Sequence, residues 1–409
     1  MPPAPLTPMN KHPDSSVFRE DTQVVVSGRD TKSYGGLINP PVYHGSTILA
    51  ESVETYNSRY LDSQDGKQVM VYGTMGNPTA WSLENAIAEL EGGYHCSTYP
   101  SGLAAISVAL MAFLKSGDHL LMTDSTYAPT RRFCNTVLRR FGVETTYYDP
   151  LIGAGIESLM RPNTAVVYTE SPGSNTFEVQ DIPAIAEVAR KHGAILQLDN
   201  TWASPLYFKP FEHGADISIQ AATKYIVGHS DVLLGSVTTT KETWKTLRDC
   251  TWQFGQCVAP DDLYLAQRGL RTMAVRLRQH QQNSLEIAEW LRNRDEVRQV
   301  LHPGLPDAPG HDIWKRDFLG ASGLFGVELK TFAKKAVEKM VDEMRLFGIG
   351  SSWGGYESLM LPVNVRDLRT ASPWRFEGPL LRLYIGLEDV DDLKDDLYDG
   401  LGRLRNFKG

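Results

Sequence analysis

The sequence predicts an α/β protein in which a mostly parallel sheet is covered by helices on both faces, followed by a smaller C-terminal α+β domain. Between residues 82 and 240, short apolar runs of strand length alternate with longer runs of helical periodicity, which is typical of parallel sheets. After about residue 270 the alternation gives way to a long basic amphipathic helix, strands and a further helix. We therefore expect an N-terminal arm in 1–75, a large domain in 76–270 and a small domain in 271–409.

The elements of the two domains follow from capping residues and apolar spacing. A first helix is expected in 82–93, because Ser82 is a candidate N-cap and a glycine pair ends the run. In the large domain, a strand and a helix are then expected in 95–118, strands in 119–124, 165–170, 194–200, 215–222 and 233–240, and helices in 128–142 and 181–193. In the small domain, helices are expected in 271–294 and 334–348 and strands in 322–330 and 380–388.

Composition points to an ordinary globular enzyme. Of 409 residues, 42% are hydrophobic and 22% are charged, with a formal net charge of -8. This acidic balance gives no reason to expect nucleic acid or an anionic membrane as a partner. No run approaches the roughly 18 apolar residues of a membrane span, and the Pro-rich N-terminus lacks the apolar core of a secretory signal.

The four cysteines match no zinc or disulfide framework, because none of them forms a C-x-x-C pair. We expect reduced thiols in a cytoplasmic protein and no metal site. Cys96 and Cys134 fall in apolar or helical stretches, where a buried, inert thiol is expected.

Polar side chains recur directly after the expected strands of the large domain. Ligands of open α/β sheets bind beyond the carboxyl ends of the strands, so these residues point to one site. They are Thr123 and Asp124, Glu170 and Ser171, Asp199 and Asn200, and Thr223 and Lys224.

Lys224 stands where a strand ends, between Thr223 and Tyr225. Most lysines are solvated surface charges, but apolar and polar residues alternate along 215–221, so we expect a half-buried strand that delivers this lysine. A desolvated lysine has a lowered pKa and a nucleophilic amine, as Schiff-base chemistry requires.

Three features converge on one cofactor. The Ser-Gly turn at 100–106 opens a helix, so the N–H groups near Gly102 and Leu103 form an anion site, although Ser-Gly starts many helices. Asp199 ends an apolar strand, where a buried carboxylate needs a cation, unless it only caps the next turn. Lys224 and Thr223 follow one strand later. A phosphate cradle, a carboxylate and an amine at successive strand ends are what pyridoxal 5′-phosphate (PLP) needs.

At these residues the chain resembles the Cys/Met-metabolism family of fold-type I PLP-dependent enzymes, and within it the bacterial cystathionine β-lyases. The resemblance covers roughly residues 20 to 400. It implies the PLP-dependent transferase-like fold, with 1–75 as arm and interface segment and 76–270 as the PLP-binding domain. Its most specific pieces are "SIQAATKYIVGHSD", "TESPGS", "LDNTWA", "RGLRT", "VRLRQH", "SSWGGYESL" and "LRLYIGLEDVDDL".

The resemblance also implies roles for single residues. Lys224 resembles the Schiff-base lysine and proton carrier, Asp199 the partner of the pyridine nitrogen, and Tyr127 the aromatic residue stacked on the ring. Lys224, Tyr127 and Tyr72 are thereby the expected catalytic residues, and Tyr72 matches a tyrosine that reaches across a dimer interface into the neighbour's site. Further matches are the phosphate binders Gly102, Leu103 and Thr223, the carboxylate-binding Arg382, and Ser352 and Trp353 in the loop over the substrate.

One position departs from the family pattern. In the family, the tyrosine that corresponds to Tyr72 is followed by one residue and then usually by an arginine. That arginine contacts the cofactor phosphate of the neighbouring subunit. In this chain Thr74 and Met75 stand at this place. Either the Gly102 helix terminus and Thr223 hold the phosphate alone, or another basic residue, such as Arg59 or Lys67, replaces the arginine.

The resemblance implies a lyase that performs α,β-elimination on cystathionine or a related sulfur amino acid, releasing a thiol, pyruvate and ammonia. Trp353 and Ala221 favour β- over γ-elimination, because γ-acting relatives usually carry leucine and serine at these positions. The alternatives are γ-elimination or γ-substitution on methionine, cystathionine or O-substituted homoserine-type substrates such as canavanine, and a non-catalytic binding module on the same fold. The family also implies a homotetramer built from dimers with shared active sites.

Overall fold

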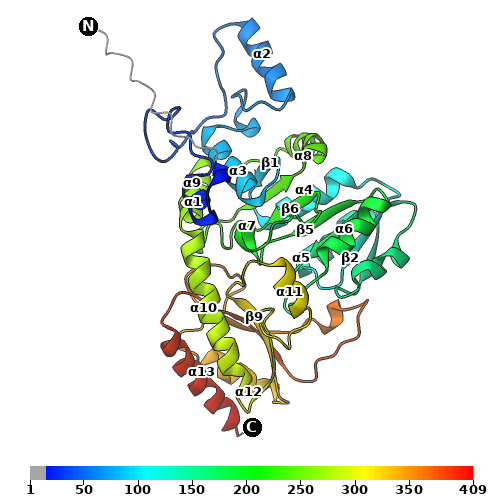
Figure 1. The fold of residues 1–409 in the computed structure, drawn as a ribbon, viewed down its shortest axis with the longest axis vertical. Coiled ribbons are helices and arrows are strands. Elements are labelled where there is room, and N and C mark those ends of the chain that lie inside the picture. The colour runs from blue at the N-terminus through cyan, green and yellow to red at the C-terminus, as the bar shows by residue number, and fades with distance from the viewer. Residues whose placement is uncertain (1–14, 409) are drawn as a thin grey trace.

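The structure, a computed structural model, describes residues 15–408, and the Pro-rich stretch before Ser15 lies outside them. Figure 1 shows two regions, each built on its own sheet, with the long helix α10 (Met273–Arg292) running from one to the other. Ahead of them come α1 (Glu20–Val26) and α2 (Val53–Gln64), of which α2 projects from the rest of the chain (Figure 1).

The larger sheet has seven strands in the order β1-β7-β6-β5-β4-β2-β3. Every neighbouring pair is parallel except the two pairs of β7, which is antiparallel to β1 and β6. The predicted mostly parallel sheet is therefore confirmed. β7 reverses because no crossover helix separates it from β6. The strands are β1 (His95–Tyr99), β2 (His119–Thr123), β3 (Glu144–Tyr148), β4 (Thr164–Glu170), β5 (Ile195–Asp199), β6 (Ile217–Gln220) and β7 (Gly235–Thr239).

Helices cover this sheet on both faces, as predicted. The helices pack on the sheet through two apolar clusters. One cluster includes Leu83 and Ile185, and the other includes Ile106 and Leu110. The helices are α3 (Pro78–Glu91), α4 (Gly102–Phe113), α5 (Ala128–Phe133), α6 (Ile182–Lys191), α7 (Ser204–Tyr207), α8 (Lys241–Gln253) and α9 (Pro260–Arg271).

The sequence interpretation is wrong about one expected helix and one expected strand of this domain. Helix α3 begins at Pro78 rather than at Ser82, because the Asn77 side chain caps it by accepting the N–H groups of Thr79 and Ala80 and proline suits the first helical position. Strand β6 is buried along its whole length rather than half-buried, because helices cover both faces of a central strand.

The smaller sheet has four antiparallel strands in the order β10-β11-β9-β8. Its apolar side packs against α10 and the C-terminal helices, with Phe325 and Leu397 in the shared core. The elements are β8 (Val297–Leu301), α11 (His311–Asp317), β9 (Leu324–Leu329), α12 (Lys334–Asp342), β10 (Leu359–Val363), β11 (Leu380–Tyr384) and α13 (Val390–Arg405).

The cysteines are free thiols, and Cys96 and Cys134 are buried. Burial raises the pKa of the Cys96 thiol well above its ordinary range and that of Cys134 to about 12. These two thiols are therefore protonated and inert, as expected. Within residues 15–408, no helix is both long and apolar enough to cross a membrane.

Candidate active site

The strand ends of the larger sheet bring the predicted residues to one edge. Lys224 follows β6, Asp199 ends β5 and Tyr127 lies just beyond β2. Because β2, β4, β5 and β6 are parallel, their carboxyl ends share this edge. The smaller region contributes Ser352, Trp353 and Arg382. Ser352 and Trp353 contact Lys224, and the charge of Arg382 lowers the pKa of Lys224.

Lys224 is held by the loop that carries Ser352 and Trp353. Its ammonium nitrogen Nζ donates to Ser352 Oγ at 2.6 Å and lies 5.3 Å from the centroid of the Trp353 ring. Gly354, at φ +93°, completes the contact, because a Cβ there would lie 2.6 Å from Lys224 Cα. Burial, followed by the charge of Arg382, lowers the pKa of Lys224 to about 8, against the opposing effect of Asp199. The Lys224 side chain is thus partly withdrawn from water, and its role as a Schiff-base lysine stays a prediction.

Asp199 is a buried carboxylate that has hydrogen-bond donors but, among residues 15–408, no cationic partner. Its Oδ1 accepts the Thr201 N–H at 3.0 Å and the Thr201 hydroxyl at 2.5 Å, and its Oδ2 accepts the Tyr168 hydroxyl at 3.5 Å. In the described part of the chain it forms no ion pair, and burial raises its pKa although Lys224 opposes this. A cation placed against this carboxylate would relieve the cost of burying it.

The start of helix α4 presents free backbone donors at the same edge. Ser101 caps the helix by accepting the Ala104 N–H, and no hydrogen bond among residues 15–408 uses the N–H of Gly102 or Leu103. A Cβ at Gly102 would lie 2.6 Å from that of Ala221, so only glycine lets the helix start so close to the end of β6. The Thr223 hydroxyl bonds both the N–H and the carbonyl of Leu234.

Tyr127 is 46% exposed, and its backbone rather than its hydroxyl is held. Its N–H donates to Glu170 Oε2 at 2.6 Å. Burial, followed by the charges of Glu170 and Asp199, raises the pKa of its phenol. The ring is therefore available to a planar ligand while its backbone is fixed.

The guanidinium of Arg382 pairs with no carboxylate in the part of the chain that the structure describes. It donates to the carbonyl oxygens of Gly350 and Ser352 at 3.0 and 3.2 Å and forms no ion pair with any described residue. Burial lowers its pKa. Its charge acts on both Lys224 and Tyr127, so a substrate carboxylate would find an unpaired cation beside the amine.

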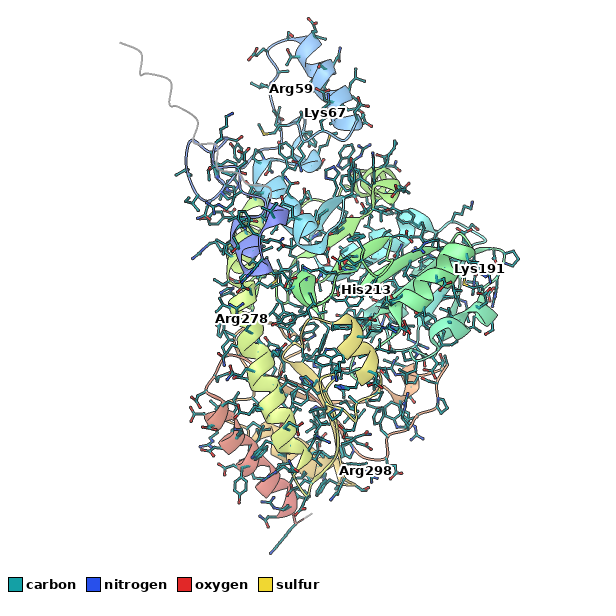
Figure 2. The ribbon with its side chains drawn as sticks, in the orientation of Figure 1. Arg59, Lys67, Lys191, His213, Arg278 and Arg298 are labelled. Atoms are coloured by element: carbon teal, nitrogen blue, oxygen red, sulfur yellow. The ribbon has the colours of Figure 1, made fainter. Side chains whose placement is uncertain are left out.

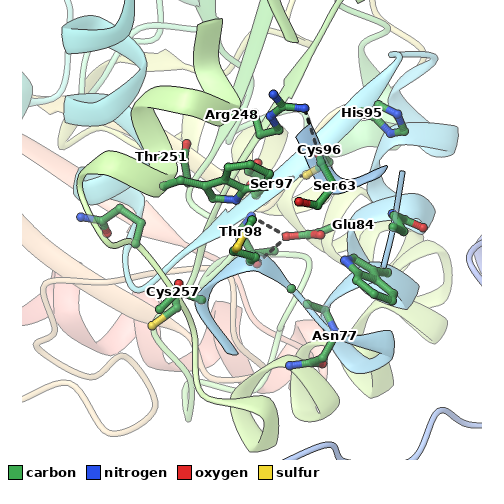
Figure 3. Close-up of a pocket in the computed structure, with 18 of the residues that line it drawn as sticks. Ser63, Asn77, Glu84, His95, Cys96, Ser97, Thr98, Arg248, Thr251 and Cys257 are labelled. Carbon is green, nitrogen blue, oxygen red and sulfur yellow. Dashed lines mark hydrogen bonds between the residues drawn. The ribbon is translucent and has the colours of Figure 1, made fainter. Parts of the chain in front are cut away.

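Tyr72 stands apart from these groups in the single chain. It is 49% exposed, and no hydrogen bond or ring contact between described residues joins it to Lys224 or Tyr127. Thr74 and Met75 line a separate pocket of about 90 Å³ beside strand β1 (Figure 3). There Glu84 accepts the N–H and hydroxyl of Thr98.

The two basic residues considered as replacements for the missing arginine are engaged within the arm. Arg59 donates to the Leu49 carbonyl at 3.1 Å, and Lys67 pairs with Asp62 at 2.6 Å. Figure 2 shows Arg59 on the projecting segment, whereas Lys67 lines the pocket beside β1 together with Thr74 and Met75.

Two of the residues that the sequence placed at the strand ends, without assigning them a part in the chemistry, lie at this edge. Glu170 holds the Tyr127 backbone, and Asp124 accepts the N–H groups of Thr370, Ala371 and Ser372. Their only signal in the sequence was their position directly after a buried strand.

Comparison with known proteins agrees with this arrangement. The family model described as "Cys/Met metabolism PLP-dependent enzyme" matches residues 21–402. The chain belongs to this family. The family resemblance and the fold-type I architecture are thereby confirmed, and PLP is the cofactor.

Curated family members are similar over nearly the whole chain. Identity is 44% to the cystathionine beta-lyase MetC of Escherichia coli (strain K12), covering 94% of this chain and 98% of MetC. It is 40% to the L-alanine/L-glutamate racemase of Wolbachia pipientis wMel, covering 95% of this chain and 98% of the racemase. The crystal structure of metB from Corynebacterium glutamicum superposes with a TM-score of 0.88 at 31% identity, covering 96% of this chain and all of that one.

The residues of the edge fit the family's cofactor. Asp199 lacks a cation that a protonated pyridine nitrogen would supply, and the free N–H groups of Gly102 and Leu103 suit a phosphate. The desolvated Lys224 amine suits a Schiff base with an aldehyde.

Proposed function

We propose that this chain is a PLP-dependent carbon–sulfur lyase that eliminates a thiol from Cβ of cystathionine or a related sulfur amino acid, releasing pyruvate and ammonia. The observation that carries the proposal is the Lys224 amine, which donates to Ser352, lies beside the Trp353 ring and has a pKa lowered by burial and by the charge of Arg382, with Asp199 opposing. The 44% identity to MetC of E. coli, a cystathionine beta-lyase, supports the reaction.

We assign each residue a part in this reaction. Bound PLP supplies the electron sink that makes a Cα proton of an amino acid removable. Arg382 binds the substrate carboxylate with its planar fork, and the neutral amine of Lys224 takes the Cα proton. Asp199 keeps the pyridine nitrogen protonated, and Tyr127 stacks on the ring. The phosphate is bound by the N–H groups of Gly102 and Leu103 and by Thr223.

Trp353 is the residue that we assign to the choice of Cβ. Its ring packs against Tyr225, with 5.5 Å between the ring centroids, and lies beside the Lys224 amine, so it bounds the space around the group that takes the Cα proton. Ser352 completes the same loop and accepts from Lys224.

A second candidate is amino-acid racemisation, which the 40% identity to the Wolbachia racemase favours. Racemisation begins with the same proton removal by Lys224 and differs in that the proton returns to the other face of Cα. The two reactions therefore differ in product and not in the residues assigned above.

We further propose that the protein is cytoplasmic, which its free thiols fit, and that it forms a homotetramer of dimers with Tyr72 in the neighbour's site. The arm supports the dimer, because it exposes large apolar side chains that a monomer would leave in water. These are Leu37, Ile38, Leu49, Val53, Tyr56, Tyr60 and Leu61.

Identification of the released products tests the proposed reaction. The PLP-loaded protein is incubated with cystathionine, methionine, canavanine or L-alanine, with Lys224→Ala as the control variant. Cystathionine should give pyruvate and homocysteine as the main products. Dominant 2-oxobutyrate would establish γ-elimination, faster formation of D-alanine would establish the racemase, and no turnover of any substrate would leave the non-catalytic binding module.

A further inference from the structure

Glu170 lies beside Asp199 at the edge of the sheet and is used by none of the steps above. The two residues are register partners on the parallel strands β4 and β5, and their exposed fractions are only 8% and 7%. Neither forms an ion pair among the residues that the structure describes. Two carboxylates so close together in a low-dielectric site do not both ionise, so the pair holds one proton.

Hydrogen bonding places Glu170 under the Tyr127 turn. Its Oε2 accepts the Tyr127 N–H at 2.6 Å and the Thr126 hydroxyl at 3.3 Å, and its Oε1 lies 2.6 Å from Ser174 Oγ. A neutral carboxylic acid satisfies the same contacts, because Oε2 accepts as the carbonyl oxygen while Oε1–H donates to the serine oxygen.

We propose that Glu170 is a positioning residue that acts as a neutral acid: it fixes the Tyr127 backbone beneath the ring site and leaves Asp199 as the one negative charge facing the pyridine nitrogen. This inference rests on the proposed roles of Tyr127 and Asp199. The two carboxyl groups then have different roles. Glu170 fixes the position of the Tyr127 backbone, and Asp199 carries the negative charge.

The pKa shifts of Glu170 and Asp199 agree with a neutral Glu170 and a charged Asp199. Burial, followed by the charge of Asp199, raises the pKa of Glu170 to about 8, although Ser174, Tyr127 and Thr126 oppose this by hydrogen bonding. Lys224 favours the charged form of Asp199, so the proton stays on Glu170. The other titratable or charged groups around the pair are Tyr127, Tyr168, Arg369 and Arg382.

Glutamine is the matched mimic of the neutral acid. In Glu170→Gln the amide oxygen accepts the Tyr127 N–H and the amide nitrogen donates to Ser174, so PLP affinity and the visible circular dichroism of the bound cofactor should stay within about threefold of wild type at pH 7. Glu170→Ala should lose roughly tenfold or more in PLP affinity. Glu328→Gln serves as the control, because Glu328 is a fully buried glutamate of the smaller sheet that accepts the N–H groups of Glu377 and Gly378.

Infrared difference spectroscopy shows directly whether the Glu170 carboxyl carries a proton. Wild type minus Glu170→Gln should show the carbonyl stretch of a protonated carboxyl at pH 7 that disappears as the pH rises past about 8. In Asp199→Asn the same band should disappear at lower pH, because the repelling charge is gone. Wild type minus Asp199→Asn isolates the carboxyl whose titration depends on Asp199 from other buried glutamates such as Glu84 and Glu91, so this variant decides the matter even if Glu170→Gln does not fold.

A carboxylate band at pH 7, an Asp199→Asn variant that leaves the titration unmoved, or a Glu170→Gln variant as impaired as Glu170→Ala would overturn the inference. The infrared result is obtained with and without added PLP. Failure of the wild-type protein to bind PLP would therefore contradict the proposed function while the state of Glu170 is still decided.

Discussion

Lys224 Nζ donates to Ser352 Oγ at 2.6 Å, so the amine at the end of the larger sheet is fixed by a loop that belongs to the region of the smaller sheet. Arg382, on β11 of the smaller sheet, donates to the carbonyl of the same Ser352. The Lys224 amine and the Arg382 guanidinium are thus joined through one residue. Their relative position depends on the contact between the two regions.

Replacing Ser352 by alanine should lower kcat more than it weakens PLP binding. The change removes the acceptor of the Lys224 amine, and hydrogen bonds to charged groups contribute about 1.5–3 kcal/mol, so kcat should fall roughly ten- to a hundredfold. Steady-state kinetics and dialysis measure the two effects. Ser351→Ala, at the exposed preceding residue, is the matched control and should leave both unchanged.

Asp199→Asn should impair turnover more than cofactor retention. A neutral amide cannot keep the pyridine nitrogen protonated, so the electron sink loses stabilisation of several kcal/mol. Single-turnover rates with saturating PLP measure this loss. A variant within a few-fold of the wild-type rate would contradict the role assigned to Asp199.

Amine labelling should show that Lys224 is a weak base. In protein freed of cofactor, only the neutral amine reacts, and its pKa is lowered to about 8, whereas an ordinary lysine titrates near ~10.4. Labelling of Lys224 should therefore be half-maximal near pH 8 and fall as the pH drops below it. Mass spectrometry of the Lys224 peptide across the pH range measures the midpoint, and a midpoint above pH 10 would rule out a desolvated amine.

Thr74→Arg should tighten PLP retention during dialysis. If Tyr72 enters the neighbour's site, an arginine at position 74 adds a charge-assisted contact to the phosphate, worth up to roughly a hundredfold in affinity. Arg59 is held by the Leu49 carbonyl, and the charge of Lys67, which lines the same pocket as Thr74, is paired with Asp62. Thr331→Arg adds the same charge at an exposed position of the other region and should change nothing. Equal or weaker retention in Thr74→Arg would count against the shared site.

The order of strands and helices around the site was predictable, because caps and apolar periodicity are local signals. The burial of Ser218 and Gln220 was not predictable from the sequence. It depends on Glu91, a residue distant in sequence that accepts hydrogen bonds from both side chains. Strand β3, with its partly exposed residues, and helices α8 and α9 gave weaker patterns and were missed.

Within the site, Lys224, Asp199 and Gly102 could be singled out from their neighbours in the sequence. Arg382, Tyr127 and Ser352 could be reached only through the family resemblance, since each looks ordinary in its own segment. The link between Glu170 and Tyr127 joins residues 43 positions apart. Such contacts between distant strand ends leave no local pattern, and only the folded chain reveals them.

The central claim is that Lys224 is the amine that binds PLP and carries the proton. Borohydride reduction of the PLP-loaded protein, followed by digestion and peptide mass mapping, tests it most directly. The reduced cofactor should be attached to Lys224, and Lys224→Ala should carry no attached cofactor and lose nearly all turnover. Attachment to a different lysine, or full activity in Lys224→Ala, would contradict it.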